Sequence, residues 1–383
     1  MIFLKTIFYF ILNSKLIFFR PPKKKILIFD QTSSGLVKKY FLKNDIHVLH
    51  TRKESLNIYV LIKNFVKKRF SSLDYFNAYI KDVDPKIIIS VIDNSPIFYK
   101  LEKNSNQKKI LIASTVRTPV HDFALFDFIK IKTKKNEKTS VDFVFSINEE
   151  IGKKFKELNV KEVVTIGSFK SNYFNFEEKK SIEILYISSW ASAHPNSKVT
   201  HDVNFEEFNN HQVKLIKNLS RYGKEHKVKI TILGKMKKNF EKNEFSFYKN
   251  IFNENEWEFI ESEKANSYQV VDRSKVVITL NSTLGYESFS RGNKTLFFDI
   301  RSTPQSLSSL KFGWPIPGIK QEGPFWTKEN SYFECKRILN KVREMDETEW
   351  ENIHKKFHMI LMPRDKNNLI FKKKLSDFYN FTN

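Results

Sequence analysis

One short segment combines small polar residues with a carboxylate and two cations. It reads NSTLGYESFSRGNK and covers residues 281–294. Ser282, Thr283 and Gly285 are typical of a turn from a strand into a helix, where backbone N–H groups and the positive end of the helix dipole suit a phosphate. Glu287 follows in the first helical turn that we expect, and its carboxylate can accept hydrogen bonds from sugar hydroxyls. The segment therefore predicts a binding site for a phosphorylated, hydroxyl-rich ligand.

Two cations follow this turn. Arg291 lies four residues after Glu287, so a helix would place both on one face, with the guanidinium on the carboxylate or on a phosphate. Lys294 is a further candidate for the phosphate. In a second interpretation the same residues are structural. Ser282 and Thr283 then cap the start of the helix, Gly292 caps its end, and Glu287 is a partner of the helix dipole. Spacing alone does not separate the two.

A second polar loop, VIDNSP, covers residues 91–96 at the end of an apolar run. Asp93 is a candidate general base for an acceptor hydroxyl, because a carboxylate at a strand's carboxyl end faces the ligand side of a parallel sheet. Asn94 is expected beside the acceptor. The alternative is that Asp93 caps the following helix.

A third loop, STVRTPVHD, covers residues 114–122. Arg117 suits an anionic acceptor, and His121 is a second candidate base, although an isolated histidine is more often structural. A fourth loop, SSWASAHPNSKVTHD, covers residues 188–202, where His194 and Lys198 are candidates for a donor phosphate. A purely structural loop is the alternative there.

An aromatic segment, FGWPIPGIKQEGPFWT, covers residues 312–327. Its glycines and prolines argue against a continuous helix or strand. Trp314 and Trp326 are expected in a lid that closes over a bound sugar and excludes water. The alternative is that these rings pack the interface between the two domains.

These loops need a scaffold, and the chain alternates between apolar and amphipathic segments. Alternation of this kind predicts parallel sheets covered by helices on both faces. The predicted strands of the first series cover 25–30, 46–50, 86–93, 108–114, 141–148 and 162–168. Those of the second series cover 182–188, 228–233, 257–261, 275–281 and 294–299.

The helices expected between the strands cover 36–44, 55–69 and 73–83 in the first series, and 205–226, 241–252, 267–273 and 284–291 in the second. We expect an N-terminal domain over 23–171, a polar linker over 172–180, a second domain over 181–330 and C-terminal helices over 331–383. The predicted fold class is α/β, with two doubly wound Rossmann-like domains.

The first 22 residues are rich in Phe and Ile and precede Lys23, Lys24 and Lys25. Polar residues interrupt the apolar run, which disfavours a bilayer span, and no signal-peptide cleavage site is evident. We expect an interfacial segment that contacts an anionic membrane, with the lysines against lipid headgroups. An ordinary N-terminal helix packed on the protein is the alternative.

The composition narrows the class of protein. The net charge is +23 over 383 residues, with 40% hydrophobic residues, so the chain is basic but folded. Arginine is scarce beside lysine, which disfavours nucleic acid as a partner. Cys335 is the sole cysteine, which excludes an intrachain disulfide and indicates a reducing compartment. GxGxxG after the first strand, the P-loop, HExxH and GxSxG are absent.

Several segments resemble one family. ILIFDQTSSGLVKKYFL, DFVFSINEEIGKKF, SYQVVDRSKVVITLNSTLGYESFSRGNK, FGWP and GPFWT are similar to bacterial surface-carbohydrate biosynthesis proteins of the two-domain GT-B glycosyltransferase type, over most of residues 23–330. The resemblance implies domains that face each other across a cleft, with a nucleotide sugar on the second and the acceptor on the first. It places Ser282, Thr283, Gly285 and Glu287 in the donor-binding loop. Thr295 stands where the retaining pattern has a second glutamate, so both stereochemical outcomes stay open.

The function expected from these observations is transfer of a sugar from a nucleotide-activated donor to a surface polysaccharide or lipid-linked glycan, on the cytoplasmic side of the inner membrane. No cofactor and no metal are expected, since Asp82 and Asp84, the only DxD pair, precede a strand and so lie at the edge opposite the ligand. Two alternatives are a CDP-activated polyol-phosphate transferase of similar fold, with His194 and Pro195 on the phosphate, and a non-catalytic glycan- or lipid-binding scaffold.

Overall fold

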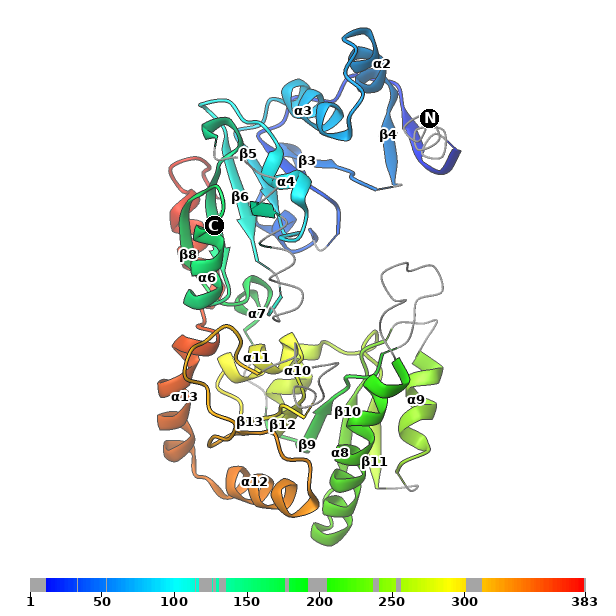
Figure 1. Ribbon diagram of the computed structural model, residues 1–383, viewed down its shortest axis with the longest axis vertical. Coiled ribbons are helices and arrows are strands. Elements are labelled where there is room, and N and C mark those ends of the chain that lie inside the picture. Colours follow the sequence, from blue (N-terminus) through cyan, green and yellow to red (C-terminus); the bar gives the residue numbers. More distant parts are fainter. Residues whose placement is uncertain are drawn as a thin grey trace. The chain divides into compact units, whose positions relative to one another are not determined.

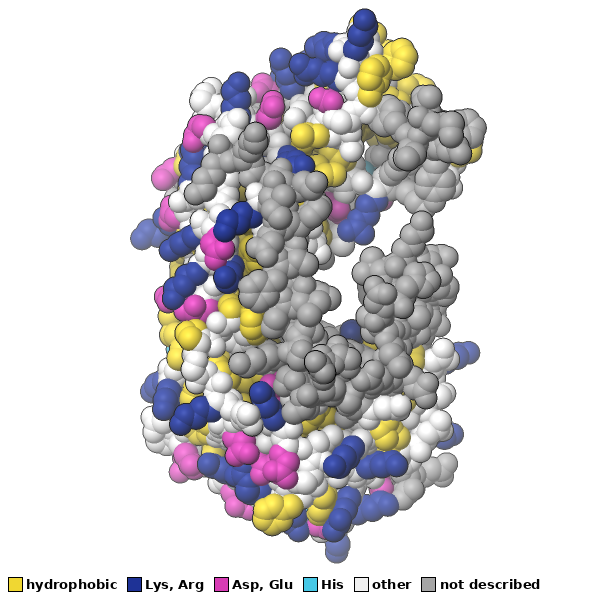
Figure 2. Space-filling model, in the orientation of Figure 1, with side chains coloured by type: hydrophobic (Ala, Val, Ile, Leu, Met, Phe, Trp, Pro, Cys, Tyr) yellow, Lys and Arg dark blue, Asp and Glu magenta, His cyan; other side chains and the backbone are white. Residues whose placement is uncertain are grey.

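The structure is a computed structural model. It describes residues 12–381 apart from 33, 53, 114, 117–125, 127–128, 131–135, 176–178, 192–204, 237–240, 253–255 and 301–311. The described chain forms two compact units (Figure 1). Unit 1 comprises residues 1–114, 122–170 and 368–383, and unit 2 comprises 115–121 and 171–367. Lysine and arginine side chains are spread over the visible face of both (Figure 2), as the net charge of +23 predicts.

Unit 1 is built on a six-stranded parallel sheet of order β3-β2-β5-β6-β7-β8. Runs such as Ile26–Phe29 and Ile87–Ser90 are buried at every position, as strands covered on both faces require. The strands are β2 (Ile26–Phe29), β3 (Ile46–Leu49), β5 (Ile87–Ser90), β6 (Lys108–Ile112), β7 (Val141–Ser146) and β8 (Val160–Thr165).

Unit 2 repeats this plan with the order β11-β10-β9-β12-β13-β14, again all parallel. Its strands are β9 (Ile182–Ile187), β10 (Ile230–Leu233), β11 (Trp257–Ile260), β12 (Ser274–Thr279), β13 (Thr295–Phe298) and β14 (Trp326–Thr327). The prediction of two Rossmann-like α/β domains is confirmed. β14 was missed, because a two-residue strand leaves no periodic signal.

Helices connect the strands in both units. In unit 1 they are α2 (Ile58–Val66), α3 (Ser72–Val83), α4 (Pro96–Lys100), α6 (Glu149–Lys156) and α14 (Leu369–Leu375). Helix α7 (Phe169–Tyr173) begins in unit 1, and its residues from Ser171 onward belong to unit 2. In unit 2 they are α8 (Phe205–His226), α9 (Glu241–Lys249), α10 (Ser267–Asp272), α11 (Thr283–Ser290), α12 (Tyr332–Glu344) and α13 (Glu347–Leu361). Among the described residues, no helix is both long and apolar enough to cross a bilayer.

The sequence prediction differs from the structure in two places near the N-terminus. The helix expected over 36–44 is replaced by two 3₁₀ turns, η1 (Val37–Tyr40) and η2 (Lys43–Asp45). Val37 and Tyr40, at the two ends of η1, are both buried. Residues 15–17, expected within an interfacial segment, form strand β1 (Lys15–Ile17), which pairs with β4 (Ser55–Asn57). The segment 1–11 lies outside the described residues.

The C-terminal helices, expected as one group over 331–383, are divided between the units. Helices α12 and α13 belong to unit 2, whereas α14 belongs to unit 1. Phe371 of α14 packs against the rings of Tyr40, Phe145 and Phe169, at centroid distances of 5.5, 5.1 and 4.9 Å. Apolar contacts with the first sheet therefore hold the end of the chain.

Candidate functional site

Each sheet reverses its strand order at one point, and parallel sheets bind ligands at the carboxyl ends of the strands beside such a point. In unit 2 the chain proceeds from β9 outward to β10 and β11, then returns to place β12 on the other side of β9. The switch point of unit 2 therefore lies between the loops that follow β9 and β12. The second of these loops is the STLGYE turn.

The turn from β12 into α11 is fixed by its own side chains. The Ser282 hydroxyl oxygen accepts a hydrogen bond from the Leu284 N–H at 3.3 Å, which makes Ser282 the N-cap of α11. The Thr283 hydroxyl oxygen accepts from the Val116 N–H at 3.4 Å. Gly285 is needed for packing, because a Cβ there would lie 2.3 Å from Thr279 Cγ2. The backbone of α11 thus approaches β12 more closely than a larger residue permits, and the helix N-terminus lies at the carboxyl edge of the sheet.

Glu287 is the carboxylate that follows the connection from β12 into α11. It lies in the second helical turn of α11, not in the first as expected, and it is buried. The Tyr268 hydroxyl donates a hydrogen bond to Glu287 Oε1 at 3.0 Å. Tyr268 is itself buried and stacks on Phe174, with ring centroids 5.1 Å apart. The orientation of the Glu287 carboxylate is therefore set by a rigid neighbour on α10.

Arg291, expected on Glu287 or on a phosphate, has other partners. Its guanidinium forms an ion pair with Asp272 and donates to the carbonyl oxygens of Ser171 and Phe174 at 3.1 and 2.9 Å. The side chain is 2% exposed. Arg291 therefore fastens α11 to α10 and to the 171–174 segment, and we withdraw it as a phosphate ligand.

The loops after β9 and β10 are held by one buried carboxylate, Glu244 of α9. It accepts hydrogen bonds from the Lys235 and Met236 N–H groups, the latter at 2.8 Å, and from the Ser188 hydroxyl. Ser188 also lies 2.7 Å from the Tyr248 hydroxyl. Glu244 thus ties the loop after β9, which borders the switch point, to the loop after the neighbouring strand β10. Glu244 lies inside a helix that contains several other polar residues, so the sequence alone does not distinguish it from them.

Unit 1 has its own switch point, between β2 and β5. Asp30 directly follows β2 and Asp93 follows β5, so the two buried aspartates lie at the carboxyl ends of neighbouring strands. Asp93 does not cap the next helix, because Ser95 occupies the N-cap of α4. The Asp93 carbonyl accepts a hydrogen bond from the Tyr99 hydroxyl at 2.9 Å, and Asn94 is exposed.

Asp30 was missed as a candidate, although it ends the clearest strand of the chain. Its φ is 76°, in the left-handed region that few residues other than glycine adopt, and such backbone is common at functional sites. Thr51 donates to its carboxylate at 2.6 Å, and the Arg52 Nε lies 3.3 Å away. Burial alone would raise the pKa of Asp30, but hydrogen bonds from Thr51 and Thr32 and the charge of Arg52 lower it overall.

Four predicted site residues, Arg117, His121, His194 and Lys198, lie outside the described residues. The two lid tryptophans are described. Trp326 is 5% exposed, packs on the Phe312, Phe325 and Phe357 rings and donates to the Lys320 carbonyl at 3.1 Å. It is a core residue of β14, and its ring is buried against other rings of unit 2. Trp314 is partly exposed in the same segment.

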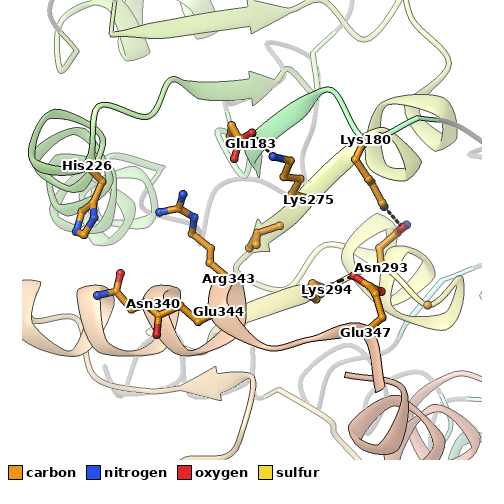
Figure 3. Close-up of a pocket in the computed structure, with 12 residues that line it drawn as sticks. Lys180, Glu183, His226, Lys275, Asn293, Lys294, Asn340, Arg343, Glu344 and Glu347 are labelled. Carbon is orange, nitrogen blue, oxygen red and sulfur yellow. Dashed lines mark hydrogen bonds and ion pairs between the residues drawn. The ribbon is translucent and has the colours of Figure 1, made fainter. Parts of the chain in front are cut away.

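Lys294 lies at the other edge of the second sheet. It lines a pocket of about 480 Å³ with Lys180, Lys275 and Arg343, and Figure 3 shows these side chains around it. Lys180, Lys275 and Lys294 all lie at or just before the amino ends of strands. The Lys294 ammonium lies 3.5 Å from Glu347 and donates to the Met345 carbonyl. Lys294 is therefore withdrawn as a ligand of a donor bound at the carboxyl edge.

The DxD pair lies near the amino edge of the first sheet, as expected. Asp82 is buried beside Lys63 at 2.6 Å, and Asp84 pairs with Lys23 at 3.0 Å. In the part of the chain that the structure describes, no group of three or more His, Cys, Asp or Glu side chains is arranged to hold a metal ion.

Comparison with known proteins gives a family. Residues 110–378, well over half of the chain, match the family model of O-antigen biosynthesis proteins. No curated protein sequence matches the chain.

Solved structures of similar fold include HepE from Anabaena in complex with UDP-glucose, with a TM-score of 0.50, 12% identity and coverage of 92% of this chain and 99% of that one. S. aureus TarM gives a TM-score of 0.48 at 12% identity, covering 80% of this chain and 59% of that one. The UDP-GlcNAc 2-epimerase of Neisseria meningitidis gives 0.48 at 10% identity, covering 95% and 100%. The chain thus spans about three fifths of the length of TarM. At such identities the likeness concerns the fold.

Proposed function

Because the chain belongs to the O-antigen biosynthesis protein family, we propose that it is a glycosyltransferase that moves a sugar from a nucleotide-activated donor to a surface polysaccharide or lipid-linked glycan. Membership agrees with the resemblance to surface-carbohydrate biosynthesis proteins that the sequence carries. The donor is the nucleotide sugar, and the proposed transfer uses no further cofactor.

The donor site is proposed at the switch point of unit 2. The observation that carries this proposal is the orientation of Glu287, buried against Tyr268 in the helix that begins at the carboxyl edge of the sheet. A carboxylate held in this way accepts hydrogen bonds from ribose or sugar hydroxyls. The N-terminus of α11, beyond the Ser282 cap, favours the negative charge of the donor phosphates.

Departure of the nucleotide needs stabilisation of its phosphate charge. We propose that helix dipoles and basic side chains supply it without a metal. His194 and Lys198 of the loop after β9 remain our candidates for this contact, since Arg291 and Lys294 are engaged elsewhere.

The acceptor is proposed to bind unit 1, with Asn94 among its contacts. Arg117, which belongs to unit 2, stays a proposed contact for an anionic group of the acceptor. Asp93 or His121 would take the proton from the acceptor hydroxyl if the reaction inverts the anomeric centre. The position of Asp93 at the switch point of the first sheet supports its candidacy.

The protein is proposed to act on the cytoplasmic surface of the inner membrane, with residues 1–22 at the lipid interface. The three lysines expected against headgroups are engaged with unit 1: Lys23 pairs with Asp84 at 3.0 Å, Lys25 with Asp45 at 3.2 Å, and Lys24 donates to the Asn44 carbonyl. These pairs offset part of the positive charge of the three lysines, so we propose that other cations contribute to the attraction to lipid.

Incubation of the protein with a panel of UDP-, GDP- and CMP-sugars and CDP-glycerol, followed by measurement of nucleotide release, tests the proposal. Release from one nucleotide sugar that increases with a lipid-linked glycan acceptor is the expected result. Release from CDP-glycerol alone would indicate a polyol-phosphate transferase. Binding of glycan without any nucleotide release or nucleotide binding would indicate a scaffold.

A further inference from the structure

Helix α2 presents an apolar face to solvent. Val60 is buried and so is the polar Asn64, whereas Ile62, Phe65 and Val66 are 58%, 67% and 75% exposed. An amphipathic surface helix of a globular protein has the opposite arrangement, with its apolar stripe against the core. The described residues therefore leave the most apolar side of α2 without a covering element.

Strand β1 extends this face. Phe18 and Phe19, directly after β1, are 63% and 82% exposed. The Asn57 side-chain amide donates to the Phe19 carbonyl at 3.0 Å and its oxygen caps α2, so one residue ties the two segments together. A depression of about 240 Å³ lies between them, and its lining comprises Phe18, Ile58, Tyr59, Ile62 and Lys63. We name the residues Phe18, Phe19, Tyr59, Ile62, Phe65 and Val66 the α2 surface.

Cations border the α2 surface. Segments 12–20 and 58–70 contain six basic residues and no acidic one. Arg20 and Lys63 pair with the buried Asp82, while Lys15, Lys67, Lys68 and Arg69 are exposed. Figure 2 shows apolar and basic side chains together at the α2 end of unit 1. The basic residues therefore adjoin the apolar ones.

The position of these cations is fixed by the way the helix ends. Lys68 has a φ of 54°, and the Arg69 N–H donates back to the Asn64 carbonyl at 2.9 Å. The chain then places Phe70 against Phe65, with ring centroids 5.6 Å apart. The backbone of three consecutive cations thus runs between Phe65 and Phe70, whose rings are 67% and 44% exposed.

We propose that the α2 surface docks onto an anionic lipid bilayer, with its apolar side chains in the acyl boundary and Lys67, Lys68 and Arg69 against lipid phosphates. Interfacial helices combine these two features. A second copy of the chain is a poor occupant, because it would bring two basic surfaces together. The core of a protein interface is depleted of charged residues, whereas here cations adjoin the apolar side chains closely.

This inference rests on the membrane location included in the proposed function. It assigns the contact with the membrane to residues outside the 1–11 segment. It is independent of the donor site in unit 2. Vesicle binding and nucleotide-sugar binding therefore test the two proposals separately.

The experiment compares sedimentation of the full chain with phosphatidylcholine vesicles that contain or lack phosphatidylglycerol. One variant carries Ile62→Ser, Phe65→Ser and Val66→Ser, and another carries Lys67→Gln, Lys68→Asn and Arg69→Gln. Controls in unit 2 are Phe333→Ser, at a residue 79% exposed, and the pair Lys355→Gln and Lys356→Gln. All these side chains are exposed, so we expect each variant to fold. The unfolding midpoint and the binding of a nucleotide sugar check this expectation.

We expect the apolar variant to lose vesicle binding by about tenfold or more. The basic variant should lose about fivefold per cation on anionic vesicles alone, and added salt should weaken the wild-type protein similarly. The unit 2 controls should bind as the wild type does.

Equal binding by the wild type and both α2 variants would overturn the proposal. So would complete loss on deletion of residues 1–11 while the α2 substitutions leave binding of the full chain unchanged, since the N-terminal segment would then carry the contact. A wild-type dimer that the apolar variant converts to a monomer, with vesicle binding unchanged, would assign the surface to a second copy and equally overturn it.

Discussion

Arg291 and Asp272 form a buried ion pair in unit 2, in which two N–H groups of the guanidinium meet the two carboxylate oxygens, one of them at 2.8 Å. The Asn293 amide adds a third hydrogen bond to Asp272 at 3.0 Å. The same guanidinium donates to two carbonyl oxygens of the 171–174 segment. One side chain thus joins α10, α11 and the 171–174 segment within unit 2.

Arg291→Ala should destabilise unit 2 by about 3–5 kcal/mol, because it leaves the Asp272 carboxylate buried without a cation. Arg291→Lys retains the charge but lacks the planar set of donors, so a smaller loss is expected. Urea unfolding of both variants gives the values. Unchanged stability together with a loss of donor affinity would instead restore Arg291 as a phosphate ligand.

Glu287→Gln should reduce affinity for the nucleotide sugar by about tenfold or more, because hydrogen bonds to a charged acceptor are stronger than those to an amide. The fold should persist, since the amide oxygen still accepts from the Tyr268 hydroxyl. Titration of the donor that the panel identifies, with a melting curve on the same sample, measures both.

Two variants sharpen this test. Tyr268→Phe removes the hydroxyl that orients the carboxylate and should weaken donor binding less than Glu287→Gln does. Glu263→Gln, at an exposed residue of the same unit, should leave it unchanged. A large loss of stability in Glu287→Gln with unchanged donor affinity would mean that the carboxylate is structural.

The two parallel sheets could be predicted from the sequence because parallel strands that are buried on both faces consist of consecutive apolar residues. Segments such as ILIF (26–29) and TLFF (295–298), with amphipathic segments between them, are typical of buried parallel strands. The switch points followed less directly, since strand order depends on which side of the sheet each helix returns to. Asp30 gained its significance only when the sheet showed which loops are neighbours.

Roles of individual side chains were harder to predict. Arg291 lies four residues from Glu287, a spacing that predicts contact, yet its guanidinium turns to Asp272, nineteen positions earlier in the chain. Gly285 resembles a phosphate-loop glycine, but the structure shows a packing requirement against Thr279. Local spacing specifies which face a residue shares, whereas competition among distant partners decides what the side chain contacts.

Trp326→Ala should lower the stability of unit 2 by about 3–5 kcal/mol, the usual cost of removing a buried aromatic ring. The ring is nearly inaccessible and packs on three aromatic neighbours. Phe333→Ala, at an exposed ring of α12, is the matched control and should cost little. Unfolding by denaturant measures both, and a near-normal midpoint with lost turnover in Trp326→Ala would revive the lid hypothesis.

His47 should make the stability of unit 1 depend on pH. Its Nε2 lies 2.8 Å from the Tyr79 hydroxyl, and burial, followed by the charges of His50 and Lys24, lowers the pKa of His47 to about 4 from its ordinary value of 6.5. Because the unfolded chain takes up a proton that the folded chain refuses, stability is fully present above pH 6.5 and is lost as the pH falls toward 4. The expected slope is at most about 1.4 kcal/mol per pH unit.

The difference in unfolding free energy between the wild type and His47→Gln, measured from pH 7.5 to 4, isolates this contribution from other groups. A difference that does not change with pH over this range would show that His47 remains as easily protonated in the folded chain as in the unfolded one.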